Sequence, residues 1–184
     1  YIEITADYYY NRVNNRILTI PTYDFNLWKM FTFDVVDIYG IDISANATIQ
    51  IGHFEFLIGG KYSYQDATDF SDPASATYGH QIPYTPHHSA SANVMIKNKW
   101  INVGWDVSVV GSRYYLPYNN WNSSMPGYVD HGLALSKKIR GRTGNILLSA
   151  HLLNLFNVQY ESVRGFPMTG RSIRIAVNYE YIKY

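Results

Sequence analysis

The histidines are the residues with the most evident capacity for chemistry, because an imidazole can bind a metal ion or haem. His87 and His88 are adjacent and follow a segment that contains His80. Adjacent residues of a strand point to opposite faces of a sheet. The chain has no cysteine and no HExxH pattern to supply further ligands. We therefore predict a solvated or hydrogen-bonded pair, with no metal site and no cofactor.

Carboxylates could serve as a general acid and base, but they are spread over many segments and no Gly-x-Ser-x-Gly sequence supplies a nucleophile. Four basic residues surround one short turn, where solvated side chains or contact with lipid phosphate are expected: Lys137, Lys138, Arg140 and Arg142. The 15 Lys and Arg balance 14 Asp and Glu, so no polyanion-binding stripe arises. We expect neither an enzyme nor a nucleic-acid-binding protein.

The elements that carry these residues are predicted to be β-strands, because apolar and polar residues alternate in eight segments. Within the clearly alternating segments, the apolar faces carry no Asp, Glu, Lys or Arg, whereas the opposite faces carry nine such residues; these segments are 2–11, 41–50, 54–63, 89–96, 101–110, 129–136, 146–153 and 172–181. His131 falls on the apolar face, so it lies near an interface or the register slips there, and His151 is expected inward as a hydrogen-bonding residue. The predicted strands lie near residues 1–13, 35–50, 54–64, 86–96, 101–113, 127–139, 146–156 and 171–182.

The connections between these strands alternate between short and long. Short turns are expected at 51–53, 97–100 and 140–145, and long loops at 14–30, 65–84, 114–127 and 157–170. In an up-and-down meander this alternation places all short turns at one end, as in outer-membrane barrels. We therefore predict an all-β fold of antiparallel, up-and-down transmembrane β-barrel strands, about eight in number.

Aromatic residues make up 16% of the chain, and their positions favour the same fold. Rings with a polar tip suit the two boundaries between lipid and water. One girdle is expected near the long loops: Tyr8, Tyr10, Phe33, Tyr62, Tyr64, Tyr114, Tyr115, Tyr128 and Tyr160. A second is expected near the short turns: Phe54, Phe56, Trp100, Tyr179 and Tyr181.

Three segments resemble TonB-dependent outer-membrane receptors. The stretch Asn154–Tyr181, NLFNVQYESVRGFPMTGRSIRIAVNYEY, is similar to the end of such receptors in its N-L-F-N strand end, its aromatic-Pro-x-x-G-R loop and its final aromatic-rich strand. Upstream, QIPYTPHHSASA at Gln81–Ala92 and IYGIDISANATI at Ile38–Ile49 resemble strand entries of the same family. The resemblance covers nearly the whole chain.

The resemblance implies the last part of a plugged barrel of about 22 strands in the bacterial cell outer membrane, which imports an iron-siderophore, haem or cobalamin. The partners it implies are outer-membrane lipid, the receptor's own plug and remaining strands, the TonB complex and an extracellular small ligand. These 184 residues contain neither plug nor energy-coupling box, and they begin with Tyr1, so we expect a processed chain or a fragment.

Two groups of residues acquire roles from this resemblance. Loop residues that could stack on or pair with the nutrient are Tyr115, Tyr118, Trp121 and Arg164. Aromatic residues similar to a C-terminal barrel-insertion signal are Tyr179, Tyr181 and Tyr184. Two alternatives remain open: an autonomous eight-stranded outer-membrane barrel with a structural or adhesion role, and a soluble β-sandwich or lipocalin-like binding protein.

Overall fold

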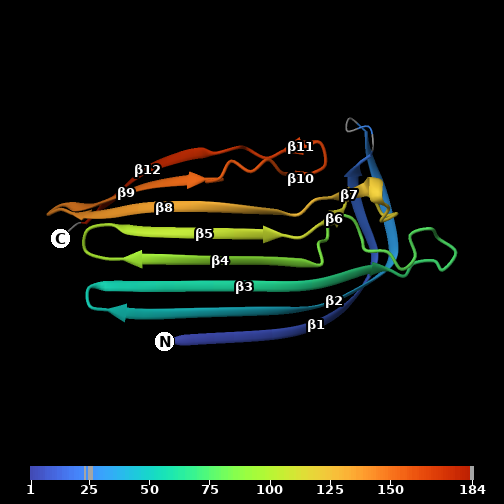
Figure 1. Cartoon of the computed structure of the whole chain (residues 1–184), viewed down its shortest axis with the longest axis horizontal. Helices are drawn as coiled ribbons and strands as arrows, with labels where there is room; N and C mark the ends of the chain where they lie inside the picture. Colours follow the sequence, from blue (N-terminus) through green and yellow to red (C-terminus); the bar gives the residue numbers. More distant parts are fainter. Residues whose placement is uncertain (23, 25–26, 183–184) are drawn as a thin grey trace.

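The computed structural model describes residues 1–22, 24 and 27–182, and its main feature is one eight-stranded antiparallel sheet (Figure 1). Every strand pairs with its neighbours in chain order, which makes the sheet an up-and-down meander. The strands are β1 (Ile2–Pro21), β2 (Trp28–Ile51), β3 (Phe54–Asp69), β4 (His88–Lys97), β5 (Asn102–Val110), β8 (Tyr128–Arg140), β9 (Gly144–Leu153) and β12 (Ser172–Tyr181).

The sheet is open and forms a single layer. Over the described residues, β1 pairs only with β2 and β12 pairs only with β9, which leaves an edge on each side. A closed eight-stranded barrel would need β1 and β12 to pair, and a sandwich would need a second sheet packed on the first. Neither alternative drawn from the sequence describes this structure.

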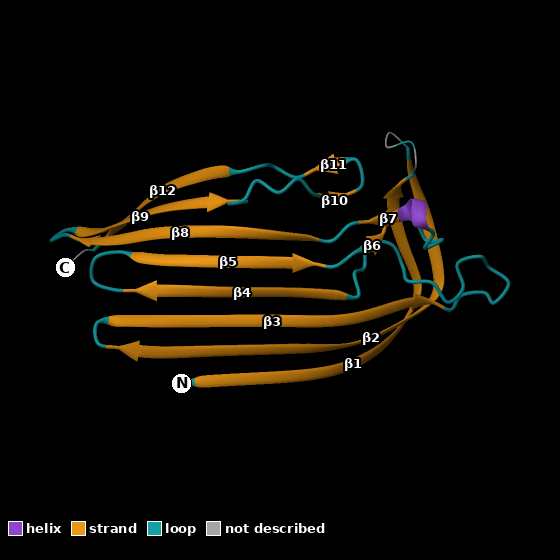
Figure 2. Cartoon of the chain, viewed as in Figure 1, coloured by secondary structure: helices purple, strands orange, loops and turns teal. Residues whose placement is uncertain are grey.

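The smaller elements all lie at the end of the sheet where the long loops are (Figure 2). They are two short hairpins and one helical turn. Their bounds are β6 (Arg113–Tyr114), η1 (Trp121–Ser123), β7 (Ser124–Met125), β10 (Glu161–Val163) and β11 (Phe166–Pro167). In the part of the chain that the structure describes, no helix is long and apolar enough to cross a membrane.

The register places the apolar residues of neighbouring strands on one face, because cross-strand partners share a face of the sheet. A continuous row of partners runs across six strands: Ala6, Ile43, Tyr62, Ala90, Val109 and Val129. A second row joins the last three strands: Leu133, Leu152 and Ile173. The period-2 pattern therefore predicted the faces of all eight strands in a mutually consistent way.

His131 stays on this apolar face, so the register does not slip there. It is the cross-strand partner of Val107. Its ring stacks on Trp105 with centroids 5.7 Å apart and meets Phe156 edge-on at 4.8 Å. The two aromatic rings shield the imidazole from the surroundings of the apolar face.

The apolar face of β2 is long enough to cross a lipid bilayer core at the strand tilt that is usual in outer-membrane barrels. On β1 and β2 an ion pair, Arg12 to Asp37 at 2.6 Å, lies on this face just beyond Tyr10 and Tyr39. From Tyr39 to the last residue of β2, Ile51, the strand is about 40 Å long at about 3.3 Å per residue. At a tilt of about 45° that length spans roughly 28 Å, close to the apolar band of about 25 Å in outer-membrane barrels.

Beyond that boundary the first two strands continue, which corrects the expected long loop at 14–30. Pairing extends through Arg16 with Phe33 and Leu18 with Phe31 to Pro21 with Trp28. The same extension carries β3 to Asp69. The polar residues of segment 14–30 predict a loop when only local sequence is considered. The apolar residues between them pack against other loops, and this packing stabilises the strand instead.

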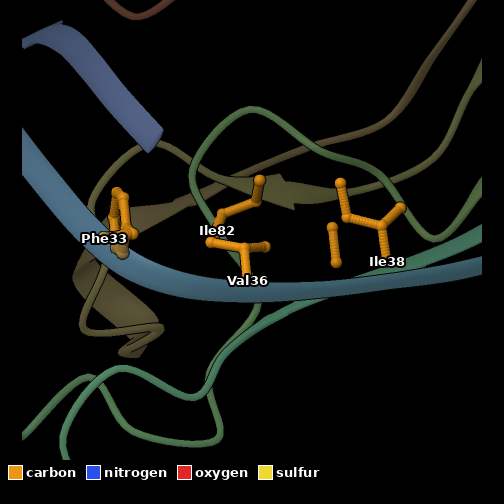
Figure 3. Close-up of a cluster of buried hydrophobic side chains, with 5 residues drawn as sticks. Phe33, Val36, Ile38 and Ile82 are labelled. Atoms are coloured by element: carbon orange, nitrogen blue, oxygen red, sulfur yellow. The ribbon is translucent and has the colours of Figure 1, made fainter. Parts of the chain in front are cut away.

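The buried core of the described chain lies in this loop-end region, not on the apolar face of the eight-stranded sheet. One cluster joins β2 and β3 to the loop after β3 (Figure 3): Phe33, Val36, Ile38, Ala67 and Ile82. A second joins the β1 extension to the loop after β5: Ile20, Tyr115, Leu116 and Met125. Phe33 and Tyr115 therefore belong to buried clusters, and their assignment to an aromatic girdle was wrong.

Candidate ligand site at the loop end

A pocket of about 290 Å³ lies between two connections at the loop end. One wall comes from the start of β8 and the residues before it, and the other from the loop between β9 and β12. The lining residues are Met125, Pro126, Gly127, Tyr128, Val158, Gln159, Tyr160, Glu161, Arg164 and Pro167.

Two tyrosines form the aromatic wall of this pocket. The rings of Tyr128 and Tyr160 are stacked, with centroids 4.0 Å apart. The Tyr160 hydroxyl donates a hydrogen bond to Asp130 Oδ2 at 2.8 Å. Burial, together with this bond, raises the pKa of Tyr160 to about 12, so the hydroxyl keeps its proton at neutral pH. Both rings line the inward side of the sheet, which corrects their expected place in the outer girdle.

Arg113 supports the wall from behind. Its side chain is only 5% exposed, and its Nη2 donates to the backbone carbonyls of Glu161 at 2.7 Å and Ser162 at 3.2 Å. Its guanidinium carbon lies 5.5 Å from the centroid of the Tyr128 ring. One buried cation therefore fixes both the β10 backbone and the stacked tyrosines.

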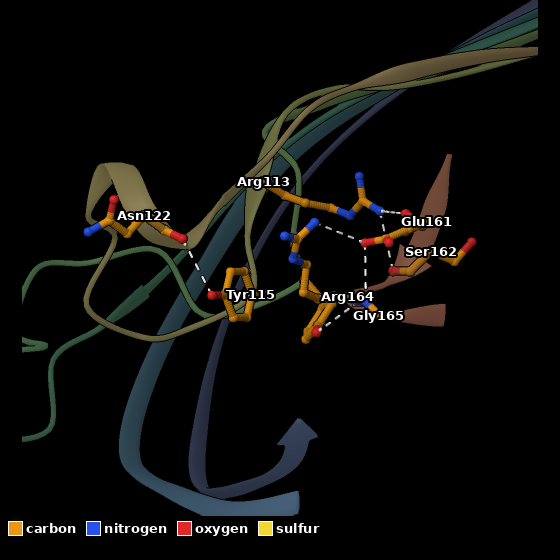
Figure 4. Close-up of polar contacts among 8 residues, drawn as sticks. Arg113, Tyr115, Asn122, Glu161, Ser162, Arg164 and Gly165 are labelled. Atoms are coloured by element: carbon orange, nitrogen blue, oxygen red, sulfur yellow. Dashed lines mark hydrogen bonds and ion pairs between the residues drawn. The ribbon is translucent and has the colours of Figure 1, made fainter. Parts of the chain in front are cut away.

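The β10–β11 hairpin presents a second arginine at its turn (Figure 4). Arg164 Nη1 and the backbone N–H of Gly165 both donate to Glu161 Oε2 at 3.2 Å. Gly165 has a φ of 81°, a left-handed conformation that glycine adopts without strain. The backbone N–H of Arg164 donates to the Tyr84 hydroxyl at 3.4 Å, and burial raises the pKa of Tyr84.

This arrangement suits recognition of a polar organic ligand. Aromatic faces offer stacking, Arg164 offers charge-assisted hydrogen bonds, and Glu161 offers an acceptor. The described residues contain no group of three or more His, Asp or Glu side chains placed to hold a metal ion.

The structure brings together two of the four loop residues singled out in the sequence. Arg164 lines the pocket, and its guanidinium lies 6.0 Å from the Tyr115 ring. Tyr115 is 4% exposed and donates a hydrogen bond to the Asn122 carbonyl at 3.4 Å, so its position is one of support. Tyr118 and Trp121 lie outside the pocket lining, and Trp121 is 91% exposed.

Sequence reasoning did not single out the remaining site residues. Arg113, Tyr128, Asp130, Tyr160 and Glu161 meet through contacts between residues 15 to 48 positions apart. The only local signal was a charged residue beside aromatic residues near a predicted strand end. That signal recurs at many positions of this chain, so it does not single out the site.

The aromatic residues of the predicted insertion signal lie at the opposite end of the sheet. Tyr179 and Tyr181 are on the apolar face of β12, opposite Ile146 and Gly144 of β9. The Tyr179 hydroxyl donates to the Thr143 carbonyl at 3.3 Å. Tyr184 lies outside the described residues.

The sequence matches the family model described as TonB dependent receptor-like, beta-barrel, over residues 1–158. The chain belongs to the TonB-dependent receptor family. The match spans seven of the eight strands of the sheet and includes the first wall of the pocket. Among curated proteins, none matches the sequence.

Solved structures of receptors and transporters share the fold. BauA, the ferric preacinetobactin receptor from Acinetobacter baumannii, superposes with a TM-score of 0.75 at 16% identity, over 97% of this chain and 27% of that chain. The ferric citrate transporter FecA gives 0.77 at 13% identity, over 98% and 29%. The copper transporter OprC gives 0.72 at 17% identity, over 98% and 29%.

The chain therefore spans less than a third of the length of these structures. Its eight strands superpose on part of each of these longer chains. These structures are receptors and transporters of iron chelates, ferric citrate and copper.

Proposed function

We propose that this chain is the C-terminal part of a bacterial outer-membrane receptor that imports a scarce nutrient at the expense of energy supplied through TonB. The observation that carries the proposal is the match to the receptor barrel over residues 1–158. The apolar face, with its height of roughly 28 Å, supports placement in a membrane. The proposal assigns transport and no enzymatic activity to the whole receptor.

The remaining parts of the receptor complete the proposal. The edges at β1 and β12 would pair with the other strands of a barrel of about 22, and the polar inward face would contact a plug domain. Unpaired strand edges would otherwise promote aggregation. Energy coupling would run through the plug and the TonB complex, outside these 184 residues.

We propose an iron-siderophore as the nutrient, with the loop-end pocket as one of its contact sites. BauA and FecA are named for ferric chelates, and a chelate with anionic oxygens and flat organic groups suits an arginine beside stacked tyrosines. Tyr118 and Trp121, which are exposed on the neighbouring loop, would add outer contacts. Haem and cobalamin are the competing nutrients.

The test is uptake by cells that carry the full receptor. Labelled ferric siderophores, haem and cobalamin are offered in turn, with and without a functional TonB complex. We expect TonB-dependent uptake of a ferric siderophore, and Arg164→Ala should weaken its binding by about 10-fold to 100-fold, because a charge-assisted hydrogen bond contributes about 1.5–3 kcal/mol. Arg171→Ala, in the same loop but outside the pocket lining, is the control.

Uptake that is equal with and without TonB would refute the transport proposal. Uptake of haem or cobalamin alone would keep the transport proposal and refute the iron-siderophore assignment. Equal affinities of Arg164→Ala and Arg171→Ala would remove the pocket from the binding path.

A further inference from the structure

The short-turn end of the sheet contains a second, larger pocket of about 530 Å³. It forms because β8 is longer than its neighbour. The last β5–β8 pair joins Asn102 to Ser136, whereas β8 continues to Arg140, which still pairs with β9. Residues 137–140 therefore lack a partner strand on the side that faces the β4–β5 turn.

Five cations line this pocket: Lys97, Lys99, Lys137, Lys138 and Arg140. Two of these cations form ion pairs: Lys97 with Glu55 at 3.4 Å and Lys138 with Glu180 at 3.2 Å. Lys99 lies over the Trp100 ring, 4.7 Å from its centroid. Within the described residues, Lys137 and Arg140 have no ion-pair partner. The pocket therefore carries an excess of positive charge, which favours a ligand with negative charge.

An apolar groove of about 280 Å³ continues from this pocket along the outward face of the sheet. The two cavities share Ile101, Ser136 and Lys137 as lining residues. The groove floor is at Ala150, whose register partners are Leu135 on one side and Ile175 on the other. A small side chain between larger ones leaves a furrow in the apolar surface.

We infer that the pocket and the groove together bind one anionic phospholipid, with an acyl chain along the groove and its phosphate at the unpartnered end of β8, where Lys137 from the outward face and Arg140 from the inward face both line the pocket. The inference rests on the proposed function, because it places the short-turn end at the inner leaflet of the outer membrane. A free phosphate would use the pocket and leave the groove empty. The continuity of a cationic pocket with an apolar furrow on the membrane face favours the lipid.

The test measures lipid binding to the full, detergent-purified receptor by native mass spectrometry. The receptor is stripped of lipid and titrated with phosphatidylglycerol, with phosphatidylcholine of the same acyl chains, and with inorganic phosphate. We expect tighter binding of phosphatidylglycerol than of phosphatidylcholine. The variant K137Q/R140Q should bind phosphatidylglycerol about 25-fold more weakly, since each cation near an anionic lipid contributes about five-fold.

Two further variants separate charge from shape. K61Q/R174Q removes the same two positive charges from the polar inward face of the sheet and should leave lipid binding unchanged. Ala150→Phe fills the groove without changing charge and should weaken phosphatidylglycerol binding several-fold. Inorganic phosphate should not compete with the lipid at equal concentration.

Equal binding of the two lipids, or equal binding by K137Q/R140Q and the parent receptor, would overturn the inference. Full competition by inorganic phosphate, with no effect of Ala150→Phe, would reassign the pocket to free anions and overturn it too. Nutrient uptake is measured separately on the same variants. If the receptor imports its nutrient but shows no preference for phosphatidylglycerol, only this inference is refuted. If it prefers phosphatidylglycerol but imports no nutrient, only the transport proposal is refuted.

Discussion

Replacement of Arg113 by methionine should release the β10–β11 hairpin while the membrane strands stay folded. The guanidinium donates to two backbone carbonyls of β10, and its side chain is almost wholly buried. Hydrogen bonds from a charged donor contribute about 1.5–3 kcal/mol. A loss of about 2–3 kcal/mol corresponds to an open hairpin that is about 30-fold to 150-fold more populated.

Trypsin cleavage after Arg164 reports this opening, because Arg164 occupies the hairpin turn and a protease needs an extended backbone. When the hairpin closes faster than it is cut, the cleavage rate follows the population of the open form. The C-terminal fragment that begins at Gly165 is quantified by mass spectrometry in the full receptor. Arg171→Met, in the same loop, is the control and should keep the parent rate at Arg164.

A cleavage rate in Arg113→Met within about threefold of the parent rate would refute the reasoning. It would mean that the packing of the loop, and not the buried guanidinium, holds the hairpin. A global loss of the folded barrel in the same sample, seen as loss of heat-modifiable mobility, would also contradict the claim that the effect is local.

Three further outcomes follow from the same structure. Gly40→Ala should destabilise the receptor by about 1–3 kcal/mol in urea unfolding, because a Cβ there would approach a hydroxyl and a carbonyl of the neighbouring strands closer than 3 Å. A Cβ at Gly60 would make only an ordinary van der Waals contact, 4.0 Å from the Ser91 carbonyl oxygen, so Gly60→Ala should be neutral. The pKa of Tyr160 is raised to about 12, so between about pH 10 and pH 12 the folded chain keeps a proton that the unfolded chain loses. Thermal stability should therefore fall as the pH rises from about 10 to about 12. The fall should be less steep in Tyr160→Phe, which lacks the titrating hydroxyl. Ile82→Ala should cost about 2–5 kcal/mol of loop protection in hydrogen exchange, while Ile58→Ala on the apolar face leaves the loops unchanged.

The strands and their faces could be predicted from the sequence because the information is local. A period of two residues needs only a window of about eight positions, and every strand carries such a window. The rule even held at His131, where a polar residue on the apolar face suggested a slip that the structure does not show. The aromatic rings of Trp105 and Phe156, which make that position acceptable, come from other parts of the chain.

The extension of β1 and β2 and the ligand pocket could not be predicted in the same way. Leu18 and Phe31 lie in strands beyond the apolar band because they pack against loop residues that follow much later in the chain. Arg113 reaches Glu161, 48 positions away, and Arg164 reaches Tyr84, 80 positions away. Such pairings depend on how the strands bring the loops together, which no local pattern encodes.

The eight-stranded sheet and the loop end are stabilised by different surroundings. This difference explains at which positions a substitution can change ligand affinity. The eight strands of the sheet are held by ladder hydrogen bonds, and in the proposed outer-membrane placement lipid would cover their apolar face, so their side chains need only be apolar on alternate positions. The loop end has its own buried clusters around Val36 and Tyr115, which fix the pocket walls independently of lipid. A loop residue can therefore change the ligand without disturbing the strands, provided that the buried clusters remain packed. Substitutions at Arg164 should then alter ligand affinity with little change in barrel stability, whereas substitutions at Met125, which is buried in a cluster and also lines the pocket, should alter both.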